Sequence, residues 1–347
     1  MLSPGELVQS ARFAPMLLAG ASDRVEEGWF RARNRTGERA PQSGVDVRAQ
    51  AQESVRAGLG FLARAQRRDG VWRGFMLAPG ASTEWITAHV ALLLEDIPEA
   101  RAMRERAARG LLASTGVRPG WGYNHRVGID SDSTAQAIMV LHGLGHAIDE
   151  AWIEQLLATH REEGGFGTYA TTRPDGQPRT WWEMPHADVT LIVVEALARL
   201  DRCAEERALA TAWLERQLRG GVLPAYWWTS PAYSLWAQAR AGFHVGASSG
   251  AARRLLAGEQ RSVYLAMLTA ASVSGGGWSE PVASAVARLV RARREDGSWR
   301  CAPCLRNTYA DHPGGFEAPG PIYADRYRVI STAHAVAALA RALQAMP

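Results

Sequence analysis

The sequence contains no lysine, and all 39 residues counted as lysine or arginine are arginine. An enzyme that uses pyridoxal phosphate needs a lysine for its Schiff base, and a P-loop needs a lysine for the phosphates, so both classes are excluded. Acidic residues are scattered among the arginines, and no continuous basic stripe is present. The net charge of +4 therefore does not indicate a partner that is a nucleic acid.

Cysteines and long apolar segments are also scarce. Three cysteines, an odd number, argue against a disulfide scaffold and favour a reducing compartment, so we expect a cytoplasmic protein. The longest apolar runs, at 88–94 and 189–197, are far shorter than a transmembrane span. The apolar stretch 13–19 has no basic segment before it and no clear cleavage site after it, so we interpret it as a helix and not as a signal peptide.

The chain is built from internal repeats with a period of roughly 50 residues. Four apolar, helix-like runs each follow a turn rich in glycine and aromatic residues; the runs begin at Thr87, Thr134, Thr190 and Thr332. The segments before the turns, such as 55–67 and 285–294, have one apolar and one charged face, whereas a run such as 134–145 is apolar nearly all round. Amphipathic helices therefore alternate with buried helices.

This alternation predicts an all-α protein with a single α/α barrel, in which the buried helices form the inner wall and the amphipathic helices the outer ring. Six helical hairpins are expected, at 52–97, 100–145, 150–200, 205–242, 250–274 and 282–345. Strand signals are nearly absent. Residues 46–347 form the barrel domain, and residues 1–45 hold a short helix and a linker outside the repeat.

Polar residues gather where the turns lead into the inner helices, at one mouth of the barrel. They are Glu84, Asp130, Asp132, Glu183, His186, Asp188, Tyr323, Asp325 and Tyr327. Burial and like charge raise the pKa of a carboxyl group, whereas the dipole of a helix N-terminus lowers it. Asp132 is therefore either an acid or a helix cap, and Asp188 at the aligned position of the next repeat favours the cap. His186 either reaches Asp132, directly or through water, or is satisfied near its own helix start.

Two further pairs of residues also allow two interpretations. His89 and His334 align with Gln136 in the first and last repeats, and they either hydrogen-bond across the seam of the ring or are ordinary polar residues of the wall; we favour the wall. Cys301 and Cys304 lack the two additional ligands of a structural zinc site, so we expect no metal and interpret them as thiols on a surface loop.

The thirteen tryptophans are many for one domain. An aromatic face stabilises a cation, so an apolar cavity with aromatic walls suits carbocation chemistry. Trp72, Trp121 and Trp299 fall in the repeated turns and are expected in the core. Other aromatic residues serve either the core or a cavity wall: Trp85, Trp227, Trp228, Tyr233 and Trp236. We expect one deep, mostly apolar cavity with Asp132 at its end.

Together these features resemble the class II terpene cyclases, the family of squalene–hopene, oxidosqualene and diterpene cyclases. The turns Gln66-Arg67-Arg68-Asp69-Gly70-Val71-Trp72 and Arg294-Glu295-Asp296-Gly297-Ser298-Trp299 resemble the repeated glutamine/tryptophan motif of that family. Asp130-Ser131-Asp132-Ser133-Thr134-Ala135 is similar to its acid motif, DxDDTA, with Ser133 where the family has Asp or Cys. Known members pair two barrels, whereas this chain has one.

The resemblance implies that Asp132 protonates an alkene or an epoxide. We expect Asp130 and His186 to tune this acid. We expect the following residues to bind the substrate: Trp85, Glu183, Asp188, Trp227, Trp228, Tyr233, Trp236 and Tyr327. We therefore expect an enzyme that cyclises a small hydrophobic isoprenoid and needs no cofactor. A diphosphate substrate would add Mg²⁺ and arginines at the mouth, such as Arg126 and Arg179.

Three alternatives stay open. The first is a glycosidase in which Asp132 pairs with Glu183 or Asp188. The second is an enzyme that modifies a non-terpene substrate on the same barrel. The third is a non-catalytic module that binds a prenyl group or a peptide.

Overall fold

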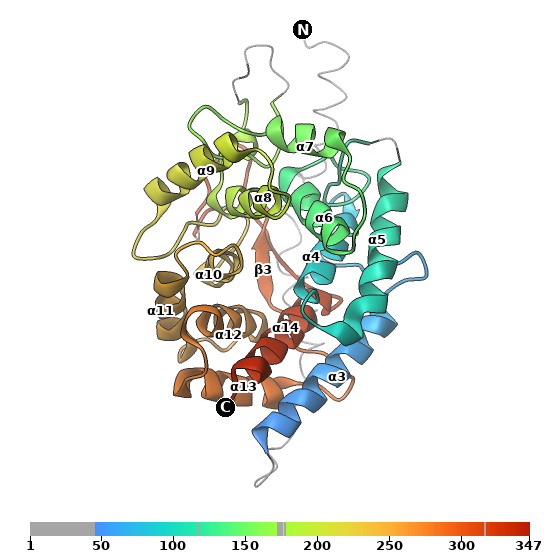
Figure 1. The fold of residues 1–347 in the computed structure, drawn as a ribbon, viewed down its shortest axis with the longest axis vertical. Coiled ribbons are helices and arrows are strands. Elements are labelled where there is room, and N and C mark those ends of the chain that lie inside the picture. Colours follow the sequence, from blue (N-terminus) through green and yellow to red (C-terminus); the bar gives the residue numbers. More distant parts are fainter. Residues whose placement is uncertain (1–45, 117, 172–175, 177, 316) are drawn as a thin grey trace.

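The computed structural model describes residues 46–116, 118–171, 176, 178–315 and 317–347. The predicted helix at 13–19 lies outside these residues. Twelve α-helices in the described part of the chain form six consecutive hairpins, which confirms the prediction of an all-α barrel (Figure 1).

In each hairpin the first helix belongs to the outer ring and the second to the inner ring. The outer helices are α3 (Val47–Ala65), α5 (Arg101–Thr115), α7 (Glu150–Leu157), α9 (Ala204–Gln217), α11 (Val245–Leu256) and α13 (Glu280–Ala292). The inner helices are α4 (Glu84–Leu93), α6 (Ser131–Gly143), α8 (Ala187–Arg199), α10 (Pro231–Arg240), α12 (Ser262–Gly276) and α14 (Val329–Ala345). Each inner helix packs against the next, and α14 packs against α4, so the inner ring is closed.

The burial of the helices follows the predicted alternation. Every residue of α4 is buried, whereas α13 buries only four residues, all on one face. An outer helix needs one apolar stripe, because its other side meets water, and an inner helix is covered on all sides.

The short strands lie in the loops between helices. Strand β1 (Met76–Leu77) pairs with β2 (Gly80–Ala81), and β3 (Pro303–Arg306) pairs with β4 (Ile322–Ala324), both antiparallel. Single 3₁₀ turns occur at η1 (Pro98–Ala100) and η2 (Trp181–Glu183). Figure 1 shows β3 at the centre of the ring, where the loop before α14 crosses the barrel.

The repeated tryptophans and threonines form one recurring contact. Trp72 is fully buried and donates its indole N–H to the carbonyl of Leu62 on the outer helix. Its backbone N–H donates to the hydroxyl of Thr87 on the inner helix. The same two bonds recur in other hairpins, at Trp121 with Leu111 and Thr134, and at Trp299 with Leu289 and Thr332. The prediction that these tryptophans belong to the core is therefore confirmed.

The glycines of the same turns make neighbouring hairpins fit together. Gly70 and Gly297 both have a φ of +87°, which favours glycine. A Cβ at Gly70 would lie 2.1 Å from the carbonyl oxygen of Arg106 on α5, and one at Gly297 would lie 2.3 Å from that of Ala57 on α3. Each turn thus packs against the outer helix of the following hairpin, and the last turn packs against the first helix.

Two predictions about single residues are wrong. His89 Nε2 lies 3.0 Å from His334 Nε2, so these histidines hydrogen-bond across the seam between α4 and α14 and are not ordinary wall residues. Cys301 and Cys304 are 3% and 0% exposed, so they are not on a surface loop. The reason is that β3, which contains Cys304, packs into the hydrophobic core.

None of the helices in the described residues combines the length and hydrophobicity that a membrane crossing requires.

Candidate active site

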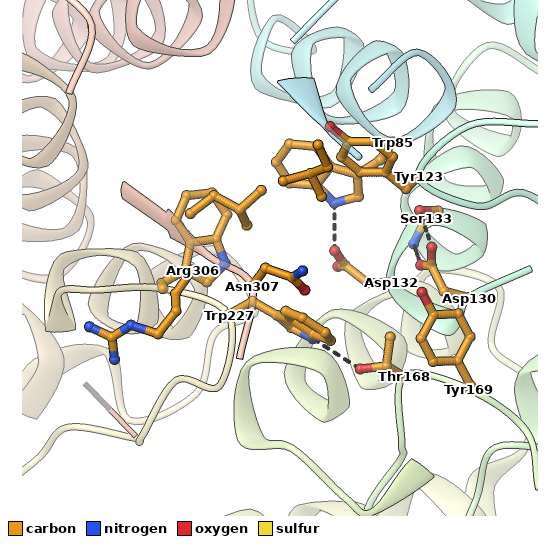
Figure 2. Close-up of a pocket in the computed structure, with 13 residues that line it drawn as sticks. Trp85, Tyr123, Asp130, Asp132, Ser133, Thr168, Tyr169, Trp227, Arg306 and Asn307 are labelled. Carbon is orange, nitrogen blue, oxygen red and sulfur yellow. Dashed lines mark hydrogen bonds between the residues drawn. The ribbon is translucent and has the colours of Figure 1, made fainter. Parts of the chain in front are cut away.

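A pocket opens where the N-terminal ends of inner helices meet β3. It contains about 600 Å³ of empty space, counting its open mouth. Its lining residues are Leu77, Trp85, Tyr123, Asp130, Asp132, Ser133, Thr168, Tyr169, Trp227, Trp228, Leu305, Arg306 and Asn307. Asp132 lines this pocket together with three tryptophans, Trp85, Trp227 and Trp228 (Figure 2).

Asp130 is the residue that caps helix α6. One of its carboxylate oxygens accepts a hydrogen bond from the backbone N–H of Ser133 at 2.6 Å, and the other accepts one from the hydroxyl of Ser133 at 2.8 Å. The first of these bonds satisfies a backbone N–H group that the helix leaves unpaired. The interpretation of Asp132 as the helix cap is therefore wrong, since Asp130 occupies that position.

Asp132 lies in the first turn of α6 and points into the pocket (Figure 2). Its Oδ2 accepts a hydrogen bond from the indole N–H of Trp85 at 2.5 Å, and its Oδ1 accepts one from the amide N–H of Gln136 at 2.9 Å. Both donors are neutral groups. Asp132 keeps some surface open to the pocket, while the surrounding protein separates it from bulk water.

Removal from bulk water changes the acidity of both carboxyl groups. It raises the pKa of Asp132 to about 7, although the bonds from Trp85 and Gln136 act in the opposite direction. It raises the pKa of Asp130 to about 8, and the negative charge of Asp132 adds to this effect. Near neutral pH the pair therefore retains a proton inside the protein.

Stability is expected to fall as the pH rises from about 6.5 to 8. The pKa values of Asp130 and Asp132 are higher in the folded than in the unfolded state, so the folded state binds more protons, and this contribution is lost as the pH passes through the folded pKa values. The slope reaches about 1.4 kcal/mol per pH unit for each group. The buried histidines His89, His186 and His334 act in the opposite direction near pH 6.5, where their unfolded forms titrate, and this effect fades by about pH 7.5.

Urea unfolding of the wild type at pH 6.5, 7, 7.5 and 8 measures this slope. In the double variant Asp130→Asn/Asp132→Asn the free energy of unfolding should no longer fall over the same range. Stability that rises with pH in the wild type would contradict the raised pKa values.

Aromatic rings form the wall beside Asp132. The ring centroids of Trp85 and Trp228 lie 6.0 Å apart, and Trp228 stacks on Tyr233 with centroids 4.0 Å apart and planes within 9°. Trp227 donates its indole N–H to the hydroxyl of Thr168 at 3.0 Å, which holds its ring at the pocket (Figure 2). Such π faces attract a cation.

The structure brings together some of the predicted substrate-binding residues. Trp85, Trp227 and Trp228 line the pocket, and Tyr233 lies directly behind Trp228. Trp236 lies deeper in the barrel, with its ring against those of two histidines.

Other predicted residues lie elsewhere. Glu183 and Asp188 bind backbone N–H groups, Glu183 that of Arg179 and Asp188 those of Tyr226 and Trp227. Tyr327 is half-buried against the hydrophobic core. These three, and the exposed Arg126 and Arg179, are absent from the pocket lining.

His186 does not contact Asp132 in the structure. Its ring stacks on that of Tyr226 with centroids 3.7 Å apart, and its buried Nε2 has no hydrogen-bond partner among the described residues. Burial lowers the pKa of His186 to about 3, so the ring is neutral. Alignment with Asp130 in the repeat placed His186 correctly at the start of α8 but did not predict its neighbours.

Several pocket residues were not predicted from the sequence. Tyr123, Thr168 and Tyr169 come from turns, and Arg306 and Asn307 from the end of β3, where no sequence pattern singles them out. In the sequence, Gln136 stands out only because it aligns with His89 and His334 in the repeats. Its spacing of four residues from Asp132 was a usable signal, because such residues share a helix face.

Among the described residues, no group of three or more His, Cys, Asp or Glu side chains could hold a metal ion. Burial also raises the pKa of the Cys304 thiol, which disfavours the thiolate form that binds metals.

The sequence matches no protein-family model and no curated protein. Solved structures do match. A variant of the type II terpene cyclase MstE from Scytonema, in complex with its substrate geranylgeranyl dihydroxybenzoate, superposes with a TM-score of 0.75 and 21% identity over 86% of this chain and 99% of that chain. ent-Copalyl diphosphate synthase from Streptomyces platensis superposes with a TM-score of 0.55 and 20% identity over 75% of this chain and 50% of that chain.

An α-1,6-mannanase from Salegentibacter sp. HEL1_6 superposes with a TM-score of 0.50 and 13% identity over 85% of this chain and 99% of that chain. The three neighbours are enzymes, and this chain spans almost all of the MstE structure but only half of the diterpene synthase. A single barrel therefore also occurs in the type II terpene cyclase MstE. The chain has the α/α-barrel fold that type II terpene cyclases adopt.

Proposed function

We propose that this protein cyclises an isoprenoid chain and that Asp132 supplies the initiating proton. The observation that supports this proposal most strongly is the position of Asp132 in an aromatic pocket, with neutral hydrogen-bond donors and a pKa of about 7. A carboxyl group that stays protonated near neutral pH is a suitable general acid.

The reaction is an isomerisation in which atoms and charge balance. Asp132 transfers its proton to one carbon of a terminal double bond, or to an epoxide oxygen, and the neighbouring carbon becomes a cation. The π electrons of the next double bond attack that cation and close a ring. Loss of one proton from the last cation gives a product with the mass of the substrate.

The wall of the pocket suits the intermediates of such a reaction. The faces of Trp85 and Trp228 stabilise a nearby cation by about 0.5–2 kcal/mol each without reacting with it as water would. Because Trp85, Trp227 and Trp228 all line the pocket, the positive charge can move along the substrate and remain beside an aromatic ring.

The substrate bound in the MstE structure, geranylgeranyl dihydroxybenzoate, is an isoprenoid attached to an aromatic acid. We include isoprenoids of this kind among the substrates proposed here. The test is incubation of the purified protein with an isoprenoid panel: geranylgeranyl dihydroxybenzoate, geranylgeranyl diphosphate and squalene. At least one member should give a product of unchanged mass with fewer double bonds, and the rate should fall above about pH 7, where Asp132 ionises. No conversion of any member, together with hydrolysis of a soluble oligosaccharide, would contradict the proposal.

The glycosidase alternative has less support. An inverting or retaining glycosidase needs two carboxyl groups on opposite sides of one bond. Asp130 is committed to capping α6, and Glu183 and Asp188 do not line the pocket. Among the described residues that line the pocket, Asp132 therefore has no second carboxyl group available to act with it.

A further inference from the structure

A chain of buried hydrogen bonds leads from Asp132 into the interior of the barrel. Gln136 on α6 donates from its amide nitrogen to Asp132, and its amide oxygen lies 2.8 Å from Nδ1 of His89 on α4. Nε2 of His89 lies 3.0 Å from Nε2 of His334 on α14. Gln136, His89 and His334 are all buried, so their polar atoms depend on one another and not on water.

The two histidines are neutral. Burial lowers the pKa of His89 to about 3, and burial, together with the nearby His89, lowers the pKa of His334. The positive charge of Arg240 on α10 acts on both rings in the same direction. A neutral imidazole has one donor and one acceptor nitrogen, and an amide has a donor and an acceptor end.

Only two arrangements of donors satisfy this chain. In the first, which we call the forward arrangement, His334 donates to His89, His89 donates from Nδ1 to Gln136, and Gln136 donates to Asp132. In the second, which we call the reverse arrangement, the side-chain amide of Gln136 is turned over. Asp132 must then donate its own proton to the amide oxygen of Gln136, Gln136 donates to Nδ1 of His89, and His89 donates from Nε2 to His334. The reverse arrangement directs the proton of Asp132 away from the pocket.

We propose that Gln136, His89 and His334 are positioning residues that hold the forward arrangement and leave the proton of Asp132 facing the pocket. This inference rests on the proposed function, since it assigns the residues a role through the acid. An ionised Asp132 accepts hydrogen bonds and cannot donate, so only the forward arrangement is compatible with the carboxylate that remains after proton transfer. Trp85, which can only donate, occupies the other oxygen in either case.

Other charged or titratable groups face the acid but are not part of this chain. Asp130 on the same helix, Asp188 on α8 and Tyr233 on α10 interact with Asp132 through their charges. The hydrogen bonds found for Asp132 in the described residues come from Trp85 and Gln136 alone. The direction of its proton is therefore controlled by these two neighbours.

The arrangement is measured directly by NMR of the whole protein labelled with ¹⁵N at histidine. The chemical shifts of the ring nitrogens distinguish the two neutral tautomers, and His89→Gln and His334→Gln assign the signals. The forward arrangement predicts a proton on Nδ1 of His89 and on Nε2 of His334 at pH 7. A proton on Nε2 of His89, or a charged ring at either position, would overturn the proposal.

Asp132→Asn provides an internal control for this measurement. Its amide oxygen must face the indole N–H of Trp85, so its NH₂ group faces Gln136 and turns the amide of Gln136 over. The variant should therefore show the reverse arrangement, with the proton on Nε2 of His89. Unchanged tautomers in this variant would mean that the chain does not sense Asp132.

The effect on catalysis is tested with Gln136→Leu. This variant should lower the rate about tenfold, since a hydrogen bond to the carboxylate is lost, and it should move the fall in activity to higher pH, since the lost bond favoured the ionised form. Gln238→Leu is the matched control: Gln238 is equally buried on α10 but binds Leu223 and Gly221. It should keep the wild-type pH profile even if stability falls.

These outcomes separate the two proposals. An unchanged pH profile in Gln136→Leu, with an active wild type, would refute the positioning role and leave Asp132 as the acid. An inactive wild type would refute the proposed function, and the tautomers would then still decide whether the forward arrangement exists.

Discussion

Replacement of Asp132 by asparagine is expected to lower turnover of the isoprenoid panel by a factor of about 100 to 10,000, the usual contribution of a general acid. The amide has nearly the shape of the carboxyl group but cannot deliver the proton. The fold should survive, because Asp130 and not Asp132 caps α6. Steady-state kinetics of the purified variant, with its thermal unfolding curve, provide the measurement.

Asp188→Asn is the matched control for this substitution. Asp188 begins the neighbouring inner helix, is also buried, and has a pKa raised to about 6 by that burial. Its Oδ2 binds the backbone N–H groups of Tyr226 and Trp227, and an amide oxygen can replace it there. Activity should fall much less than in Asp132→Asn. Equal and mild losses in both variants would mean that Asp132 is not the acid.

Replacement of Arg240 by methionine is expected to lower the free energy of unfolding by about 3 kcal/mol, since it leaves buried carboxylates with too little positive charge. Arg240 and Glu195 are 6% and 5% exposed at the side chain, and their charged atoms lie 3.0 Å apart. Arg240 also pairs with Glu95, and Arg199 binds both glutamates. This network joins α8 and α10 to the end of α4. Urea unfolding gives the loss.

The control for Arg240→Met is Arg202→Met. Arg202 forms a bidentate ion pair with Glu150, at 2.8 and 2.6 Å, but both side chains are exposed to solvent. Removal of such a surface pair should leave the unfolding midpoint unchanged. Equal midpoints for Arg240→Met and the wild type would show that the buried network does not stabilise the barrel.

The architecture was predictable because its signals are local and repeated. Thr87, Thr134 and Thr332 each bond a turn tryptophan, so the same residue types recur at the same places in the chain. The helical period of the apolar residues then distinguishes outer from inner helices. A ring of six hairpins follows from these two patterns without any long-range information.

The partners of Asp132 were not predictable in the same way. Trp85 reaches Asp132 from another helix, and the distance between them depends on the packing of α4 against α6. His186 occupies the expected start of α8, but its contact with Tyr226 depends on the loop before α10, which does not repeat. Cys304 is buried because β3 crosses the barrel, and no periodic pattern marks that strand.

The most direct test of the proposed chemistry is cyclisation in D₂O by the wild type and by Asp132→Asn. Asp132 exchanges its proton with solvent, so each product molecule formed from one of the alkene substrates named above should carry one deuterium at the carbon where cyclisation begins. Mass spectrometry and ²H NMR of the product locate the label at carbon. One deuterium per product with the wild type, and product formed at least about 100-fold more slowly by the variant, is the expected result. A product without deuterium, or equal amounts of labelled product from both proteins, would show that Asp132 does not start the reaction.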